Sequence, residues 1–338
     1  MFAALTGCSK CGGGPAEPGA PISTHASAAP VTAPDARASA GATVAAPPAY
    51  DPAKLSAPPG CKRADPVMHL VGDHLEDTTD IALYKLDPQT LGLRRIGPVE
   101  CWPFSIAVER TGTVWGLGDN EKLYTFGPDA SCHKLSYVIE QHDFGHFHIA
   151  FAAGNAGDKA EKGGETLFAS DERRDRDSDN APSEDDEPRE SRGLGRIDRD
   201  KLTLSVDGTY LRGGEPNANP CSIAGTGDGR LFALCPGGEL TEVELRRDAG
   251  APKVGVPLQK IDVEGPAWPH PAQTRPIAFW GGAIWLFAQP CDLTSPCDGK
   301  GSPVIRVDVA TRRATRYADL PIVVRAAGAS TCAPVNVP

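Results

Sequence analysis

Four segments of this chain share one pattern, and that pattern restricts the fold more than any other feature. Each segment has an apolar strand, a turn that usually contains glycine, and a second strand with Val, Leu or Ile before Trp or Phe. The second strands read GTVWGL (112–117), ETLFAS (165–170), GRLFAL (229–234) and GAIWLF (282–287). Repeats built only of strands stack as the blades of a β-propeller. The sequence therefore predicts an all-β propeller.

Strand assignment gives five blades, and no long helical period competes with it. Blades two to five are expected at 104–108, 113–118, 122–126, 134–139; 147–151, 166–170, 193–198, 202–206; 222–225, 230–235, 239–245, 256–263; and 277–280, 283–288, 304–309, 314–320. Blade one has only 67–71, 81–86 and 91–96. A surplus strand at 322–326 is expected to complete blade one and remove an open edge. The prediction is a five-bladed ring of twenty strands closed by the C-terminal strand; six blades is the alternative.

Composition narrows the classes of partner. The net charge of −10 argues against nucleic acid, which needs a basic surface. No run of 18 apolar residues occurs, so the sequence predicts no transmembrane helix. Ten cysteines are typical of an exported protein rather than of a reducing cytosol. We expect a monomer.

The first eight residues resemble the end of a bacterial lipoprotein signal. The motif Leu5-Thr6-Gly7-Cys8 fits at each of its four positions, although the apolar segment before it is short, and the alternative is a chance match. The resemblance implies a lipid on Cys8 that contacts the membrane, and Ser9 after it implies the outer membrane. Residues 9–60 are rich in Gly, Pro and Ala and are expected to form a disordered tether. The predicted organisation is a residual signal (1–8), this tether, and a propeller (61–338).

The segment from Gly112 to Asp129 carries a further resemblance. Its pattern of Gly-x-Val-Trp, a strand and an acidic turn resembles bacterial propellers of the two-component-regulator and virginiamycin-lyase-like type. That resemblance covers most of residues 67–326 and implies the fold more than a function. Lyases of the group are associated with a metal-assisted His/Glu site, but no His and Glu occupy the corresponding positions of these repeats.

Eight cysteines remain when Cys8 and Cys11 are set aside, and eight allow 105 pairings. The two cysteines flanking the turn at Asp228 are equidistant from it, so a hairpin brings them opposite each other. The blade register favours four disulfides: Cys61–Cys332, which would staple the ring, Cys101–Cys132, Cys221–Cys235 and Cys291–Cys297. The rival interpretation is a cysteine metal site.

Loops that join consecutive blades are rich in aromatic, His and Pro residues, and loops on a rigid scaffold are common binding sites. Candidate binding residues on one face are Trp102, Phe144, His146, His148, Trp268 and His270. The alternative is that these side chains seal contacts between blades.

Two segments imitate metal sites. The acidic insert 171–192 places Asp175, Asp177, Asp179 and Asp186 at spacings that suggest a calcium loop, but neighbouring arginines neutralise them, so a solvated charged loop is the default. His142, His146 and His148, with His133 nearby, suggest zinc or copper but lack an evident third ligand on the same face. We therefore expect no metal and no cofactor.

The sequence contains no nucleophile elbow, phosphate-binding loop or His-Glu-x-x-His motif. The first functional hypothesis is a lipid-anchored envelope propeller that binds a protein, glycan or small ligand on one loop face. The alternative is a propeller enzyme, of the lyase-like or hydrolase kind, with histidines near the central channel.

Overall fold

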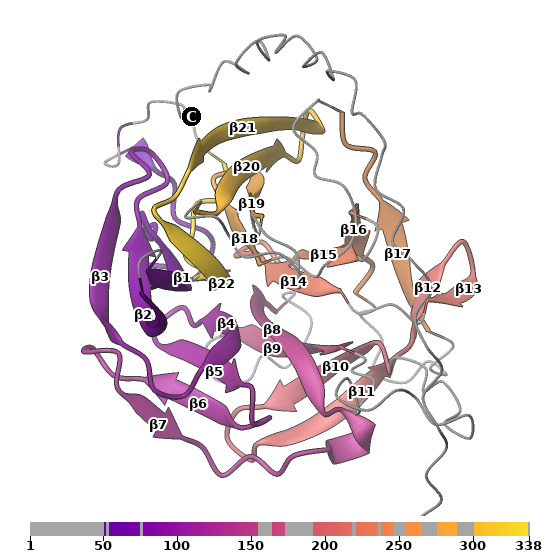
Figure 1. The fold of residues 1–338 in the computed structure, drawn as a ribbon. Coiled ribbons are helices and arrows are strands. Elements are labelled where there is room, and N and C mark those ends of the chain that lie inside the picture. The colour runs from indigo at the N-terminus through magenta and orange to yellow at the C-terminus, as the bar shows by residue number, and fades with distance from the viewer. Residues whose placement is uncertain are drawn as a thin grey trace, which may run out of the picture. The chain divides into compact units, whose positions relative to one another are not determined.

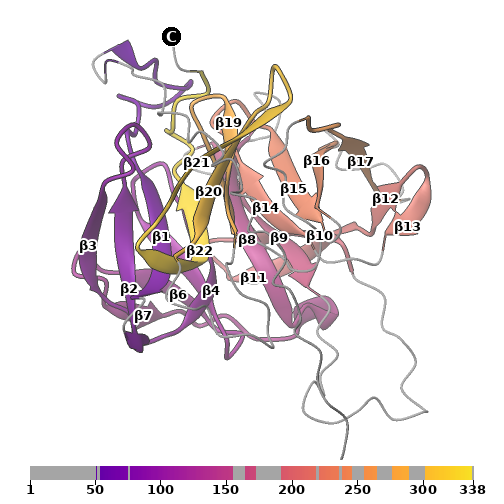
Figure 2. The ribbon, with the colours of Figure 1, turned by 45° about the horizontal axis from the view of Figure 1, so that its top comes forward.

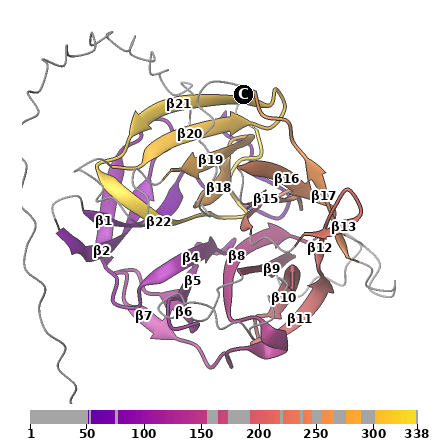
Figure 3. The ribbon, with the colours of Figure 1, turned by 45° about the vertical axis from the view of Figure 1, so that its right-hand side comes forward.

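The computed structural model describes residues 51, 54–74, 77–154, 164–172, 192–217, 221–235, 238–245, 255–264, 276–288 and 301–336. These residues form five small sheets arranged as blades around one axis (Figures 1 and 3). The predicted five-bladed β-propeller is therefore confirmed, and the six-bladed alternative is wrong. The expected lipid site at Cys8, the tether up to residue 50 and the calcium-like aspartates lie outside the described residues.

The strands follow one order in every blade, from the innermost strand outward. Blade one contains β22 (Ile322–Ala329), β1 (Met68–His74), β2 (Asp77–Leu86) and β3 (Leu93–Pro98). Blade two contains β4 (Pro103–Val108), β5 (Val114–Gly118), β6 (Leu123–Phe126) and β7 (Cys132–Lys134). Blade three contains β8 (His146–Ala153), β9 (Glu165–Glu172), β10 (Leu194–Asp198) and β11 (Thr203–Gly208), preceded by the short helix η2 (Gln141–Asp143).

Blades four and five continue the pattern. Blade four contains β14 (Ser222–Gly225), β15 (Leu231–Cys235), β16 (Glu239–Val243) and β17 (Val256–Lys260). Blade five contains β18 (Ile277–Trp280), β19 (Ala283–Phe287), β20 (Pro303–Asp308) and β21 (Arg313–Asp319). Most expected strands therefore occur within a few residues of their predicted bounds.

Closure of the ring joins the last strand to the first. β22 pairs antiparallel with β1, from Met68 opposite Ala329 to His74 opposite Ile322, and Figure 1 shows the yellow strand beside the indigo one. β1 is therefore paired on both sides, and its inner edge is not left open to template aggregation.

Two parts of the strand prediction were wrong. The fourth strand of blade two was expected at 134–139, but β7 ends at Lys134 because Tyr137 turns into the core and packs edge-on against Phe147, 6.0 Å between ring centroids. The sequence also missed the hairpin of β12 (Tyr210–Arg212) and β13 (Glu215–Asn217), which adds to blade four because β12 pairs in parallel with β17. Figure 2 shows this hairpin at the outside of the ring.

The aromatic residue of each repeat fills the space between neighbouring blades. Trp115 packs edge-on against Phe151 of blade three, with ring centroids 6.0 Å apart. Phe232 stacks on Phe279 of blade five, with ring centroids 5.7 Å apart. Phe168 and Trp285 lie in two further buried clusters. Burying one large side chain of this kind stabilises the fold by about 2–3 kcal/mol. The recurring position of the aromatic residue in each repeat is therefore explained by packing between blades.

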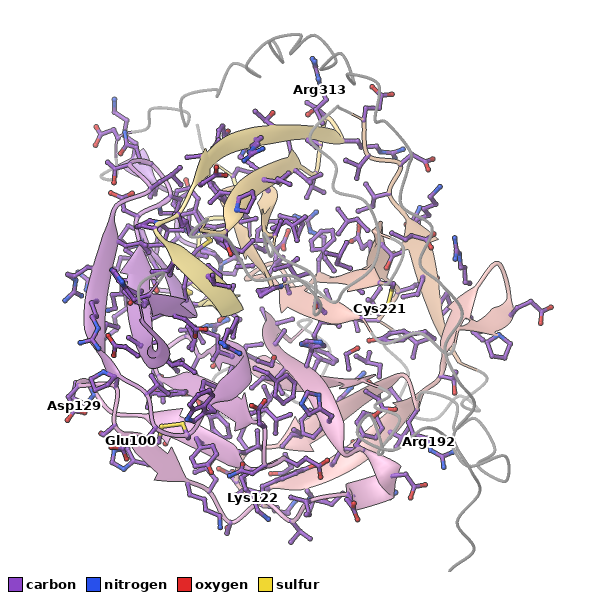
Figure 4. All side chains as sticks on the ribbon, in the orientation of Figure 1. Glu100, Lys122, Asp129, Arg192, Cys221 and Arg313 are labelled. Carbon is purple, nitrogen blue, oxygen red and sulfur yellow. A yellow bond between two sulfur atoms is a disulfide. The ribbon has the colours of Figure 1, made fainter. Side chains whose placement is uncertain are left out.

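Three disulfides occur among the described residues: Cys61–Cys332, Cys101–Cys132 and Cys221–Cys235. These are pairs that the blade register favoured. The last lies where β14 begins, and Figure 4 labels Cys221 there. Cys291 and Cys297 lie outside the described residues. The bonds indicate a protein that folds outside the reducing cytosol. No helix in the described ranges is both long and apolar enough to cross a membrane.

Candidate functional site

The propeller axis is nearly filled. One cavity touches all five inner strands, has a volume of about 10 Å³, and is lined by apolar residues such as Ile106, Ile149, Ile223, Ile277 and Ala327. A space of this size holds at most one water molecule. Of the described residues, no histidine lines this cavity.

The face where the inner strands end is covered by the C-terminal segment 330–336; we call it the sealed face. Ser330 Oγ donates to the Glu109 carbonyl oxygen at 3.0 Å, and Gly281 N donates to the Pro334 carbonyl oxygen at 2.7 Å. Thr331 is fully buried. The segment therefore bonds to turns of different blades across the axis, and the disulfide at Cys332 holds it there.

A buried carboxylate anchors that segment. Glu165 accepts hydrogen bonds from Thr331 Oγ1 at 2.7 Å and from Arg110 N at 3.0 Å, and its Oε1 lies 3.3 Å from Arg199 Nη1. Burial raises the pKa of Glu165 above its ordinary value, despite these hydrogen bonds and the positive Arg199. Its partners all belong to the ring, so this network is structural: it joins blade two, blade three and the C-terminal segment.

The opposite face, where the inner strands begin, we call the rim face, and Trp102 is its exposed aromatic residue. Its side chain is 44% exposed, and Val138 is the other large hydrophobic residue exposed in the described ranges. Trp102 has φ +45°, a left-handed conformation that a bulky side chain rarely adopts. The Cys101–Cys132 disulfide and a hydrogen bond from Asp119 N to the Trp102 carbonyl oxygen, 3.1 Å, hold it there.

A guanidinium lies over this indole. The Cζ atom of Arg325 in β22 is 6.0 Å from the Trp102 ring centroid. Arg325 also forms a forked ion pair with Asp73 of β1, at 2.6 and 2.8 Å from Nε and 2.6 Å from Nη2. Asp73 is 2% exposed, and its carboxylate raises the pKa of Arg325. Because the fork fixes the guanidinium, Trp102 and Arg325 form a rigid surface, which we call the rim platform.

The predicted histidines occupy the next blade junction. His146 is 4% exposed and stacks on Phe104, with ring centroids 3.4 Å apart and an interplanar angle of 11°. His148 meets the edge of Phe104 at 5.8 Å. His133 lies instead on the outer strand β7, beside Ser131. Within the described ranges, no three His, Cys, Asp or Glu side chains come together as metal ligands.

The six candidate binding residues therefore separate into groups. Trp102 is exposed on the rim face, whereas Phe144 is fully buried and packs edge-on against Phe147 at 6.2 Å. The structure thus places the ring of Phe144 in a buried cluster rather than on the exposed rim face. Trp268 and His270 lie outside the described residues.

Sequence reasoning missed Arg325 and Asp73. The available signal was an arginine inside the apolar strand Ile322-Val323-Val324-Arg325-Ala326, since an inner strand accommodates a charge only with a partner.

A polar pocket of about 460 Å³ lies on the outer part of blade five. Glu264, Arg306, Asp308, Thr311 and Arg313 line it. Arg306 pairs with Asp308 at 3.1 Å, and Asp308 accepts from Thr311 N at 2.8 Å, so much of its polarity serves the turn between β20 and β21. We assign no ligand to it.

No protein-family model and no curated protein matches the sequence. Among solved structures, a gluconolactonase from Xanthomonas campestris is similar with 12% identity, covering 77% of this chain and 78% of that one, at a TM-score of 0.42. TolB from Acinetobacter baumannii is similar with 10% identity, covering 75% of this chain and 53% of that one, at a TM-score of 0.40. Both are bacterial proteins, and at these identities and TM-scores neither similarity assigns a property to this chain.

Proposed function

We propose that this protein is an exported, non-enzymatic binding protein that holds its ligand on the rim platform. The observation that carries the proposal is the exposed indole of Trp102, kept in a strained backbone conformation and set against an ion-paired arginine. Strained residues persist where the surrounding structure overdetermines them, and they cluster at functional sites.

The rest of the ring favours this location. The axial cavity of about 10 Å³ is too small for a substrate, and the sealed face is covered by the C-terminal segment. The described histidines at the second junction are stacked in the blade contact rather than grouped as ligands. These observations favour surface binding over chemistry in a channel.

The platform suits a ligand with a flat apolar face. An indole beside a guanidinium offers a π surface and a neighbouring positive charge, which together suit a sugar ring or an aromatic side chain that carries a negative group. We propose a ligand of that kind, glycan before protein, because the platform is a small rigid surface rather than an extended apolar patch.

Binding to Trp102 can be tested with a glycan array followed by calorimetric titration of the glycans that bind, a readout that does not depend on the indole itself. We expect Trp102→Ala to weaken binding at least tenfold, Trp102→Phe to weaken it less, and Val138→Ala to leave it unchanged. The Val138 side chain is 68% exposed and serves as the matched control. Unchanged binding by Trp102→Ala, or a stoichiometric metal ion in the purified protein, would contradict the proposal.

We further propose that the propeller is tethered to the bacterial envelope, in the outer membrane, through a lipid on Cys8. The motif at residues 5–8 and the Gly- and Pro-rich segment after it support this part of the proposal. Metabolic labelling with a radioactive fatty acid should mark the wild-type chain and not Cys8→Ser. Equal labelling of the two, or no labelling of either, would overturn it without touching the rim platform.

A further inference from the structure

A row of basic side chains crosses blade one near the sealed face. His69 of β1 lies opposite Lys85 of β2, and Lys85 lies opposite Arg94 of β3. Directly opposite residues on antiparallel strands have Cβ atoms about 5 Å apart and point to the same face of the sheet. His69 also lies opposite Gly328, near the end of β22, which places the row at the sealed-face end of the blade.

The two cations of this row are not held in ion pairs in the described part of the chain. Neither Lys85 nor Arg94 forms an ion pair within the described residues, whereas the adjacent Arg95 pairs with Asp80 at 2.7 Å. Like charges directly opposite on paired strands destabilise a sheet. In a chain of net charge −10 such an arrangement is unexpected for a purely structural surface.

The third member of the row is buried and incompletely bonded. His69 is 3% exposed, and its Nδ1 atom has no hydrogen-bond partner among the described residues. Burial, and then the positive Lys85 and Arg94, lower the pKa of His69 to about 3, so the imidazole is neutral at physiological pH. A buried polar atom of this kind requires an explanation such as a missing ligand.

The charge around the row extends toward the N-terminal segment. Arg63 and Lys85 both act electrostatically on the carboxyl group of Asp65. Asp65 Oδ1 accepts a hydrogen bond from Val67 N at 3.2 Å, and the carboxyl group forms no ion pair with either cation. Burial raises the pKa of the Asp65 carboxyl group above its ordinary value, against the lowering effect of Val67 N, Lys85 and Arg63.

We infer that Lys85, Arg94 and His69 form a binding site for a phosphate-type oxyanion, separate from the rim platform. A guanidinium and an ammonium supply charge-assisted hydrogen bonds to phosphate oxygens, and the neutral imidazole supplies a further one. An anion between Lys85 and Arg94 removes the repulsion of the unpaired row. The ligand of this site is either a free phosphate in solution or the phosphate of an anionic lipid headgroup.

The site can be tested on the full chain by calorimetric titration with inorganic phosphate at low ionic strength, where charge interactions are least screened. We expect saturable binding that weakens at least tenfold in Lys85→Gln and in Arg94→Gln. Lys134→Gln, which removes an exposed cation from β7, is the matched control and should bind as the wild type does. Arg94 is exposed, so its variant keeps the test valid if Lys85→Gln does not fold.

Sedimentation with phosphatidylglycerol vesicles, against phosphatidylcholine vesicles, identifies the source of the phosphate. Binding to the anionic vesicles that is lost in both variants indicates a lipid headgroup, and binding of free phosphate alone indicates a soluble anion; either supports the site. The ring resonances of His69 should shift with phosphate. Absence of saturable binding for both probes, or equal weakening by Lys134→Gln, would overturn the inference.

Discussion

Burial disfavours the charged form of a side chain in this propeller, and a neighbouring opposite charge favours it. Asp73 is buried but forms a forked ion pair with Arg325. Glu165 is buried but accepts a hydrogen bond from Thr331 and lies beside the positive Arg199. His69 differs because its charged neighbours are themselves cations, so protonation of its ring is disfavoured twice. These differences follow from tertiary placement, which is why the sequence alone nominated His146 and His148 and passed over His69.

His69 gives the protein a specific acid sensitivity. Its pKa is about 3 in the folded chain against an ordinary 6.5, so between these values the unfolded chain binds a proton that the folded chain does not. Stability therefore falls as the pH drops below 6.5, by about 3 kcal/mol at pH 4 from this one group. In His69→Gln we expect the difference in unfolding free energy between pH 7 and pH 4 to shrink by that amount.

Urea denaturation at the two pH values measures this effect. Other groups titrate in the same range, and Glu165, whose pKa is raised, contributes with the opposite sign. Comparison of the variant with the wild type cancels those contributions. An unchanged pH dependence in His69→Gln would show that the ring is not neutral when folded.

The inner strands approach each other closely, and small residues permit it. A Cβ atom at Gly225 of β14 would overlap the carbonyl oxygen of Phe151 in β8, whereas one at Gly154 would meet its nearest atom at 3.4 Å. The narrow axis follows from such contacts.

We expect Gly225→Ala to lower the unfolding free energy by about 2 kcal/mol, because overpacking forces blades three and four apart. Gly154→Ala is the control and should change it by no more than about 0.5 kcal/mol. Thermal or urea unfolding measures both. Equal effects of the two substitutions would contradict the close approach described for β14 and β8.

The elements of the ring were largely predictable, because strong apolar alternation and Gly turns identify strands within a hairpin. The hairpin of β12 and β13 was not predictable from the sequence. Its strands have only three residues each, and β12 is held by a parallel pairing with β17, a long-range contact that no local sequence pattern indicates. Likewise, the sequence predicts Tyr137 as part of a strand, but its side chain lies in the core beside Phe147. The exposure of Trp102 depends on how Asp119 and Arg325 fix its loop, which spacing does not reveal.

The ring of blades is closed by the pairing of its last strand, β22, with its first, β1. A surplus strand after the last blade predicted it, and the pairing of β22 with β1 confirms that prediction. The disulfide between Cys61 and Cys332 spans 271 positions of sequence, against 14 for Cys221–Cys235.

Removing the closing disulfide should therefore destabilise the ring more than removing the hairpin disulfide. In the chain-entropy model the double variant Cys61→Ser/Cys332→Ser loses about 5.5 kcal/mol, and Cys221→Ser/Cys235→Ser about 3 kcal/mol. Scanning calorimetry of both proteins gives the order of the two losses. The reverse order would mean that strand pairing, not the covalent link, dominates closure.

The sealed face also gathers both ends of the described chain. A Cβ atom at Gly227 would touch Pro58, and one at Gly282 would lie within 3.7 Å of Asn336, so each end runs against a turn of that face. A reporter group attached at Pro58 or at Asn336 would therefore lie on the face of the ring opposite Trp102. A label at either position should leave the indole of Trp102 accessible to a ligand.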